Sequence, residues 1–241
     1  MEATLKLSKS IPAPVLLLHC VGGLAMAAVI VATYLAPNPD VKGFRVPEAA
    51  RIVVFHVPCH WVALVGFVAA VFFGARYLQT RDLAFDNKSA AAAEIGLLFV
   101  TLGTLTGAVF GGQQWDGSWF YFDLREPKLF SILILMLIYA ALFALRSSFD
   151  DPDLRARFSA VYTIFGLIAT PYLMYVLPRS MSPMHPPDLS AYEPYRVCLN
   201  LALILYTWLF VWLWSLRTRA GQWRMEHYGP VVIEEYPGAT L

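Results

Sequence analysis

Six long apolar stretches constrain the fold of this 241-residue chain more than any other feature of the sequence. A helix that crosses the hydrocarbon core of a bilayer needs about 20 mostly apolar residues. Backbone polar groups inside the bilayer must be hydrogen-bonded within the protein, so such stretches form helices. The predicted spans are 15–35, 57–78, 90–110, 129–145, 158–177 and 197–216. The sequence therefore predicts an all-α, polytopic membrane protein with six transmembrane helices in a single domain, 1–241.

The composition supports a membrane protein and excludes several classes of function. Hydrophobic residues make up 58% of the chain and charged residues 15%, whereas a soluble domain carries about 25% charged residues. A net charge of +1 provides no basic field for nucleic acid. The chain has no phosphate-binding loop, no catalytic triad and no paired catalytic carboxylates, so we do not expect an enzyme.

The three cysteines stand far apart, at Cys20, Cys59 and Cys198. They form no C-x-x-C motif, which argues against a zinc site or a thiol–disulfide enzyme. We expect single thiols buried among the helices.

The distribution of basic residues predicts the orientation in the membrane. Six spans place both termini on one side, and eleven of the 18 Lys and Arg residues fall on that side. Basic residues are in excess on the cytoplasmic side of membrane proteins, so both termini are predicted to be cytoplasmic. The outer loops are then 36–56, 111–128 and 178–196. The third of these contains five prolines, which exclude a regular helix there.

Two histidines lie at the predicted outer face. His56 opens the second span, where Pro58 suits the first turn of a helix because its missing N–H costs nothing there. His185 lies in the third outer loop. Two neutral imidazoles from separate segments are able to supply both axial ligands of a heme iron. The alternative is that each histidine is an interfacial side chain with its polar tip in water.

Other histidines carry weaker signals. His60 shares a helix face with His56, and such an i, i+4 pair can bind a transition metal, but no third ligand is evident. His19 lies within the first span, where we expect a packed and hydrogen-bonded side chain. The pattern assigns no role to His60 or to Cys59.

The second outer loop, 111–128, is unusually aromatic. Five aromatic residues occur within eight positions: Trp115, Trp119, Phe120, Tyr121 and Phe122. Together with glycines that allow close backbone approach, they predict a flat apolar shelf suited to a porphyrin ring. The alternative is an amphipathic segment lying in the headgroup layer.

The charged residues of this loop fit the same interpretation. Arg125, with Lys128, is suited to pairing with the two propionates of a heme. Asp123 and Glu126 are predicted to fix the loop or to orient the basic groups.

These motifs resemble those of a known family. Segment 117–125 resembles the tryptophan-rich signature W-G-x-W-W-x-W-D-x-R of the CcmC/CcmF/CcsA cytochrome c assembly superfamily. His56, Pro58 and Trp61 match the H-V-P-x-x-W motif of the CcmC family, heme exporter protein C. The six-span layout and the placement of His185 between the fifth and sixth spans also fit that family.

The sequence departs from the family pattern at several positions. Asp116 stands where the first Trp is usual, and Phe120 and Phe122 replace Trp residues, which removes two indole N–H donors. The loop is one residue longer before Gly117, the Trp residues usual before the second histidine are missing, and His60 is not part of the pattern.

The resemblance implies a function. A family member binds heme b at the periplasmic face of the cytoplasmic (inner) membrane and presents it to the heme chaperone CcmE during cytochrome c maturation. It works beside the ABC transporter subunits CcmA and CcmB and the small protein CcmD. Carried over to this chain, the axial ligands of the heme iron would be His56 and His185, with Pro58 and Trp61 as supporting residues. The heme loop would comprise Trp115, Gly117, Trp119, Phe120, Tyr121, Phe122, Asp123 and Arg125.

Three other functions remain open. A CcsA-type protein would deliver heme directly to apocytochrome as part of a cytochrome c synthetase, but such proteins usually have more helices. A membrane cytochrome of b type would need two helix-borne histidine pairs, and only His19 lies clearly within a span. A membrane scaffold subunit would bind no heme at all.

Overall fold

The computed structural model describes residues 12–38, 45–177, 180 and 193–228. Within these ranges the chain is helical, contains no β-strand and has six helices long and apolar enough to cross a membrane. The predicted all-α fold with six spans is therefore confirmed. His185 lies outside the described residues.

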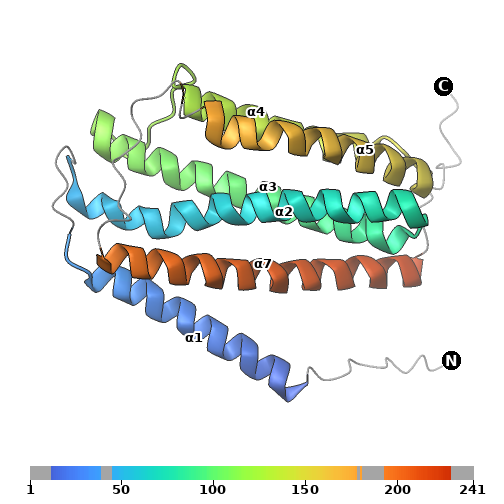
Figure 1. Cartoon of the computed structure of the whole chain (residues 1–241), viewed down its shortest axis with the longest axis horizontal. Coiled ribbons are helices and arrows are strands. Elements are labelled where there is room, and N and C mark those ends of the chain that lie inside the picture. Colours follow the sequence, from blue (N-terminus) through green and yellow to red (C-terminus); the bar gives the residue numbers. More distant parts are fainter. Residues whose placement is uncertain (1–11, 39–44, 178–179, 181–192, 229–241) are drawn as a thin grey trace, which may run out of the picture.

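The helices lie side by side in one elongated bundle (Figure 1). Several of them extend beyond the apolar stretches that predicted them. Their bounds are α1 Ala13–Leu35, η1 Pro47–Ile52, α2 Val53–Thr80, α3 Leu83–Gly111, η2 Gly112–Asp116, α4 Pro127–Ser147, α5 Pro152–Pro171, η3 Tyr172–Val176 and α7 Glu193–Tyr228.

Carboxylates cap the starts of three helices. The side chains of Asp82, Glu126 and Asp151 accept hydrogen bonds from the first backbone N–H groups of α3, α4 and α5. Pro127 and Pro152 follow two of these caps at the first helical position, where proline is well tolerated. These local signals fix where each helix begins.

The longest packed interface joins α2 and α3, and it depends on small side chains. A Cβ atom added at Gly66 would lie 2.9 Å from the carbonyl oxygen of Ala92 and 3.0 Å from Cα of Gly96. Small residues at such positions let helix backbones approach closely in a membrane. Nearby, Phe67 of α2 stacks on Tyr139 of α4 with 3.5 Å between ring centroids.

Helix α1 is the most peripheral element and packs mainly on α7 (Figure 1). His19 stacks on Trp212 with 4.5 Å between ring centroids. Its Nδ1 has no hydrogen-bond partner among the described residues, so His19 is packed as expected but is not hydrogen-bonded through that atom. Cys59 and Cys198 are buried thiols, whereas Cys20 on α1 is exposed.

Candidate functional site

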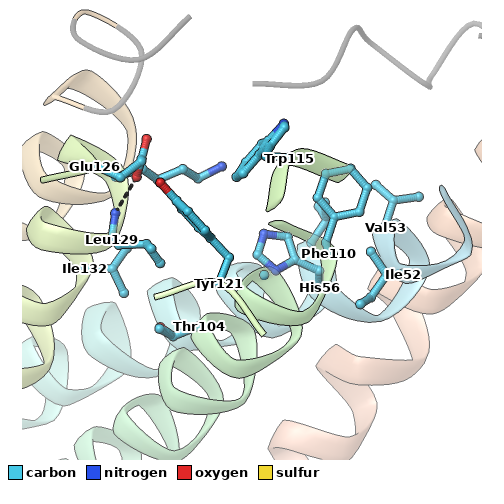
Figure 2. Close-up of a pocket in the computed structure, with 13 residues that line it drawn as sticks. Ile52, Val53, His56, Thr104, Phe110, Trp115, Tyr121, Glu126, Leu129 and Ile132 are labelled. Atoms are coloured by element: carbon cyan, nitrogen blue, oxygen red, sulfur yellow. Dashed lines mark hydrogen bonds between the residues drawn. The ribbon is translucent and has the colours of Figure 1, made fainter. Parts of the chain in front are cut away.

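A pocket opens where the start of α2, the end of α3, η2 and the start of α4 meet. Figure 2 shows His56 at its centre, with Tyr121, Trp115 and Phe110 around it. The walls are mostly apolar, and Glu126 and Lys128 are the charged residues that line it. The pocket therefore suits a largely apolar ligand with few polar groups.

The place of His56 within its helix differs from the predicted one. Helix α2 begins at Val53 and directly continues η1, so Pro58 lies inside the helix and not in its first turn. Without an N–H, Pro58 cannot donate to the carbonyl of Val54. The predicted location of Pro58 in the first turn is therefore wrong, because the helix already begins at Val53.

The imidazole of His56 is anchored by α3. Its Nδ1 lies 2.9 Å from the carbonyl oxygen of Gly103 and 3.3 Å from Oγ1 of Thr106. Because a carbonyl only accepts, the bond to Gly103 assigns a hydrogen to Nδ1, and in a neutral imidazole the lone pair is then on Nε2. A metal-ligating histidine typically has this arrangement, with the second nitrogen donating to a backbone carbonyl.

Three aromatic rings are seated on a column of glycines along α3, Gly103, Gly107 and Gly111, which we call the glycine column. The ring of His60 fills the space beside Gly103, and an added Cβ at Gly107 would lie 2.8 Å from Cε1 of His56. Residues four apart share one helix face, so the three glycines form a continuous groove. The spacing G-x-x-x-G-x-x-x-G in the sequence is the signal from which this groove could be predicted.

The third glycine of the column receives a residue of the aromatic loop. An added Cβ at Gly111 would lie 2.9 Å from Cζ3 of Trp115. The indole makes edge contacts with Phe110 and Tyr121, at centroid distances of 6.0 and 5.9 Å. The backbone N–H of Tyr121 donates to the carbonyl of Ala108 at 2.9 Å, which folds the loop back over the end of α3.

The remaining three aromatic side chains of the loop face outward. Trp119 is 82% exposed, and Phe120 and Phe122 are each nearly half exposed. The two Phe rings stack on each other at 6.3 Å. Of the five aromatic residues in the loop, Trp115 and Tyr121 therefore line the pocket, and the other three do not.

The loop is shorter than predicted because η2 extends α3 as far as Asp116. Gly117 ends this helix in the left-handed region, with φ of 76°, a conformation that favours glycine. The side-chain amide of Gln114 also accepts from the N–H of Arg45 and donates to the carbonyl of Val46, at 2.9 and 2.6 Å. The segment before η1 is thereby tied to η2.

The charged residues between Asp123 and Lys128 differ in what they contact. Arg125 is exposed and holds Asp123 through several hydrogen bonds, the shortest at 2.8 Å. These bonds lower the pKa of the Asp123 carboxyl and raise the pKa of the Arg125 guanidinium. Glu126 caps α4, and Lys128 lines the pocket. The basic residue at the pocket is thus Lys128, while Arg125 is held by Asp123.

Trp61 supports the helix that carries His56 but lies away from the pocket. Its indole N–H donates to Oγ1 of Thr207 at 3.0 Å, which joins α2 to α7. His185 belongs to the connection between η3 and α7, and both of these helix ends lie at the pocket end of the bundle (Figure 1).

A conventional metal centre needs several ligand side chains grouped together. Across 12–38, 45–177, 180 and 193–228, no three His, Cys, Asp or Glu side chains are grouped to hold an ion. A heme iron is already held by four porphyrin nitrogens and needs only one or two axial ligands. The anchored imidazole and apolar walls therefore fit a heme better than a bare metal ion.

Known proteins provide an independent comparison. The sequence model of the family described as CcmC, heme exporter protein C, matches residues 4–224. Heme exporter protein C of Bradyrhizobium diazoefficiens is 31% identical over 185 residues, which cover 74% of this chain and 67% of that protein. The corresponding protein of Paracoccus denitrificans is 27% identical, covering 74% of this chain and 78% of that protein. A putative cytochrome c biosynthesis ccmC-like mitochondrial protein of Marchantia polymorpha is 29% identical, covering 63% and 60%.

Proposed function

The chain belongs to the CcmC family, heme exporter protein C, and from this premise we propose that it binds heme at the pocket beside His56. It presents the heme at the periplasmic face of the inner membrane for transfer to a CcmE-like chaperone during cytochrome c maturation. The observation that carries the proposal is the bond between Nδ1 of His56 and the carbonyl of Gly103. With Nδ1 bonded to a backbone carbonyl, Nε2 is the nitrogen that would coordinate a metal, beside apolar walls that suit a porphyrin.

Each part of a heme has a counterpart at the site. His56 would provide one axial ligand, and His185, from the connection between η3 and α7, would provide the other. The ring would lie against Phe110 and Trp115 at the pocket. Burial of its apolar surface, at about 25 cal/mol per Å², would contribute several kcal/mol. The bound group would be heme b, since no cysteine pair is present for covalent attachment.

The propionates would be paired by basic groups. Lys128 lines the pocket, and its ammonium group would act as a point charge for one propionate. Arg125 would be the second partner, and it must exchange Asp123 for a propionate in order to act. Such an exchange would leave binding reversible, which a protein that hands its ligand to a chaperone requires.

The exposed aromatic residues of the loop would face the partner. Trp119 and the Phe120–Phe122 stack offer apolar surface beside the pocket. Family membership further suggests association with CcmA, CcmB and CcmD. The excess of Lys and Arg on the side of the termini favours both termini in the cytoplasm, which would place the pocket on the periplasmic side.

Replacement of the two proposed ligands tests this function. The purified protein, loaded with heme, is expected to have a six-coordinate low-spin absorption spectrum. His56→Ala or His185→Ala should abolish that spectrum, and the double variant should lose most of the bound heme. The measurements are absorption spectroscopy and heme quantification at equal protein concentration.

A histidine far from the pocket provides the control. His227 is exposed near the end of α7 and bonds the carbonyl of Trp223, so His227→Ala should leave the heme spectrum unchanged. An unaltered spectrum in the His56→Ala, His185→Ala double variant would remove the ligand assignment. A wild-type protein that binds no added heme would favour the scaffold function instead.

A further inference from the structure

We propose that His60 is a positioning residue that fixes the orientation of the His56 imidazole, and so of the axial ligand. This inference rests on the proposed function of His56, but its geometric part concerns the protein without heme. His60 is not part of the H-V-P-x-x-W motif, and nothing in the comparisons assigns it a role.

The two imidazoles are in direct contact. His60 follows His56 by one helical turn, and their ring centroids lie 4.6 Å apart with an interplanar angle of 52°. The Nδ1–H of His60 donates to the carbonyl oxygen of His56 at 3.2 Å. This bond fixes the plane of the His60 ring, and the fixed ring forms a wall beside His56.

Gly103 holds both rings at once. Its missing side chain makes room for His60, because an added Cβ would collide with Cε1 and Nδ1 of that ring. Its carbonyl oxygen accepts from Nδ1 of His56 at 2.9 Å. One turn further along α3, Gly107 contacts the edge of the His56 ring. His56 is therefore bounded by the Gly103 carbonyl, by Gly107 and by the ring of His60.

The same geometry argues against His60 as a ligand. His56 lines the pocket, and His60 does not. If His60 were truncated, a ring-sized space would open between α2 and α3. His56 would then be able to rotate about its terminal torsion, which is broad for imidazoles, and leave the carbonyl of Gly103. The effect of His60 on a bound heme is thus indirect and acts through the ring of His56.

The first test uses the heme-free protein. We expect His60→Ala to increase the rate at which diethyl pyrocarbonate modifies His56, measured by mass spectrometry of the peptide that contains it. His60→Phe keeps the bulk of the ring and should remain close to the wild-type rate. An unchanged rate in His60→Ala would overturn the proposal.

The second test uses the heme-loaded protein. His60→Ala should keep six-coordinate heme but bind it about 10-fold more weakly, the lower end of the effect of outer-shell partners on metal affinity. The electron paramagnetic resonance g-values and the midpoint potential of the heme bound to His60→Ala should differ from those of the wild type. His60→Phe should largely restore both. If His60→Ala instead loses six-coordination as His56→Ala does, His60 is itself a ligand and the proposal is wrong.

A glycine substitution provides an independent way to displace the ring of His60. Gly103→Ala should displace the His60 ring and reproduce the weaker binding of His60→Ala. The double variant should be no worse than either single variant, because residues that share one space are not additive. Gly23→Ala is the matched control, since an added Cβ there meets nothing within 4 Å. Full additivity of Gly103→Ala and His60→Ala would contradict the shared space.

The two proposals fail in different ways. If His56→Ala leaves the heme spectrum unchanged, the proposed function fails, while a raised reactivity of His56 in His60→Ala would still support the positioning geometry. If His56→Ala abolishes the spectrum and His60→Ala changes neither reactivity nor spectrum, only the role of His60 fails.

Discussion

The two ends of the helix bundle are held together by different kinds of contact. At the end opposite the pocket, Arg146 of α4 forms a two-pronged ion pair with Asp86 of α3, at 2.7 and 2.8 Å. There the hydroxyl of Tyr77 also donates to Asp153, and Asn87 donates to the carbonyl of Thr218. At the pocket end, rings rest in spaces left by glycines, and the bonds of the His56 imidazole go to the carbonyl of Gly103 and to Oγ1 of Thr106. Ion pairs and polar bonds hold the first end, whereas at the pocket end glycines make room for rings.

This contrast separates the part of the chain that maintains the fold from the part that carries the site. A buried ion pair costs much when one partner is lost, because the other is left uncompensated. Glycines at the pocket contribute no such bonds, yet they decide where each ring lies. We therefore expect substitutions at the first end to change stability and substitutions at the second to change ligand binding.

The largest effect on stability is expected at the buried ion pair. Arg146→Ala should lower the free energy of unfolding by about 3 kcal/mol, because the Asp86 carboxylate would stay buried without its partner. The side chains of Arg146 and Asp86 are only 15% and 8% exposed. Denaturant titration in mixed micelles measures the change.

An exposed ion pair at the same end is the control for that measurement. Arg217 and Glu94 lie 2.7 Å apart, but their side chains are 41% and 48% exposed. Arg217→Ala should therefore cost about 0.5 kcal/mol or less. Equal losses in the two variants would show that burial does not distinguish the pairs.

A substitution in the glycine column tests the other end. Gly107→Ala would place a Cβ atom 2.8 Å from Cε1 of His56 and should weaken heme binding about 10-fold or more. Stability should change little, since an overpacking cost of about 1 kcal/mol is offset by a similar gain in helix propensity. Heme titration and denaturant titration of the same variant separate the two effects, with Gly23→Ala as the control. If Gly107→Ala lost much stability but bound heme as the wild type does, the two ends would not differ in the way described.

Much of the fold could be predicted from hydropathy, and the helix ends could not. The apolar stretches marked all six spans, because burial in lipid requires long apolar helices. Helix α7 continues to Tyr228, well past the predicted end at 216, since its last turns are polar and lie outside any apolar window. The start of α2 was missed because proline is usual in the first turn of a helix, whereas Pro58 lies inside this one.

The candidate site could be predicted in its residue types but not in its arrangement. His56 and the aromatic loop stood out because such residues rarely cluster at a helix end. Which rings face the pocket depends on the left-handed turn at Gly117 and on the bond from Tyr121 to Ala108. No periodic pattern in the sequence predicts that loop conformation. Arg125 appeared suited to a propionate, but Asp123 lies two residues away and holds it.

The smallest effect is expected at the exposed pair Asp123–Arg125, where the pocket end does use charge. Hydrogen bonds from Arg125 lower the pKa of Asp123 below its ordinary value of 3.8. The pair's contribution to loop order is therefore fully present above that value and is lost as the pH falls through the lowered pKa. The fluorescence of tryptophan near the loop should change in that acidic range, and Asp123→Asn should remove the transition. Since both side chains are exposed to solvent and salt screens such pairs, high salt should weaken the transition, whereas heme binding that depends on His56 should be less sensitive to salt. If Asp123→Asn shows a transition of equal size, the transition belongs to another carboxyl group. The Asp123–Arg125 pair would then not stabilise the pocket end.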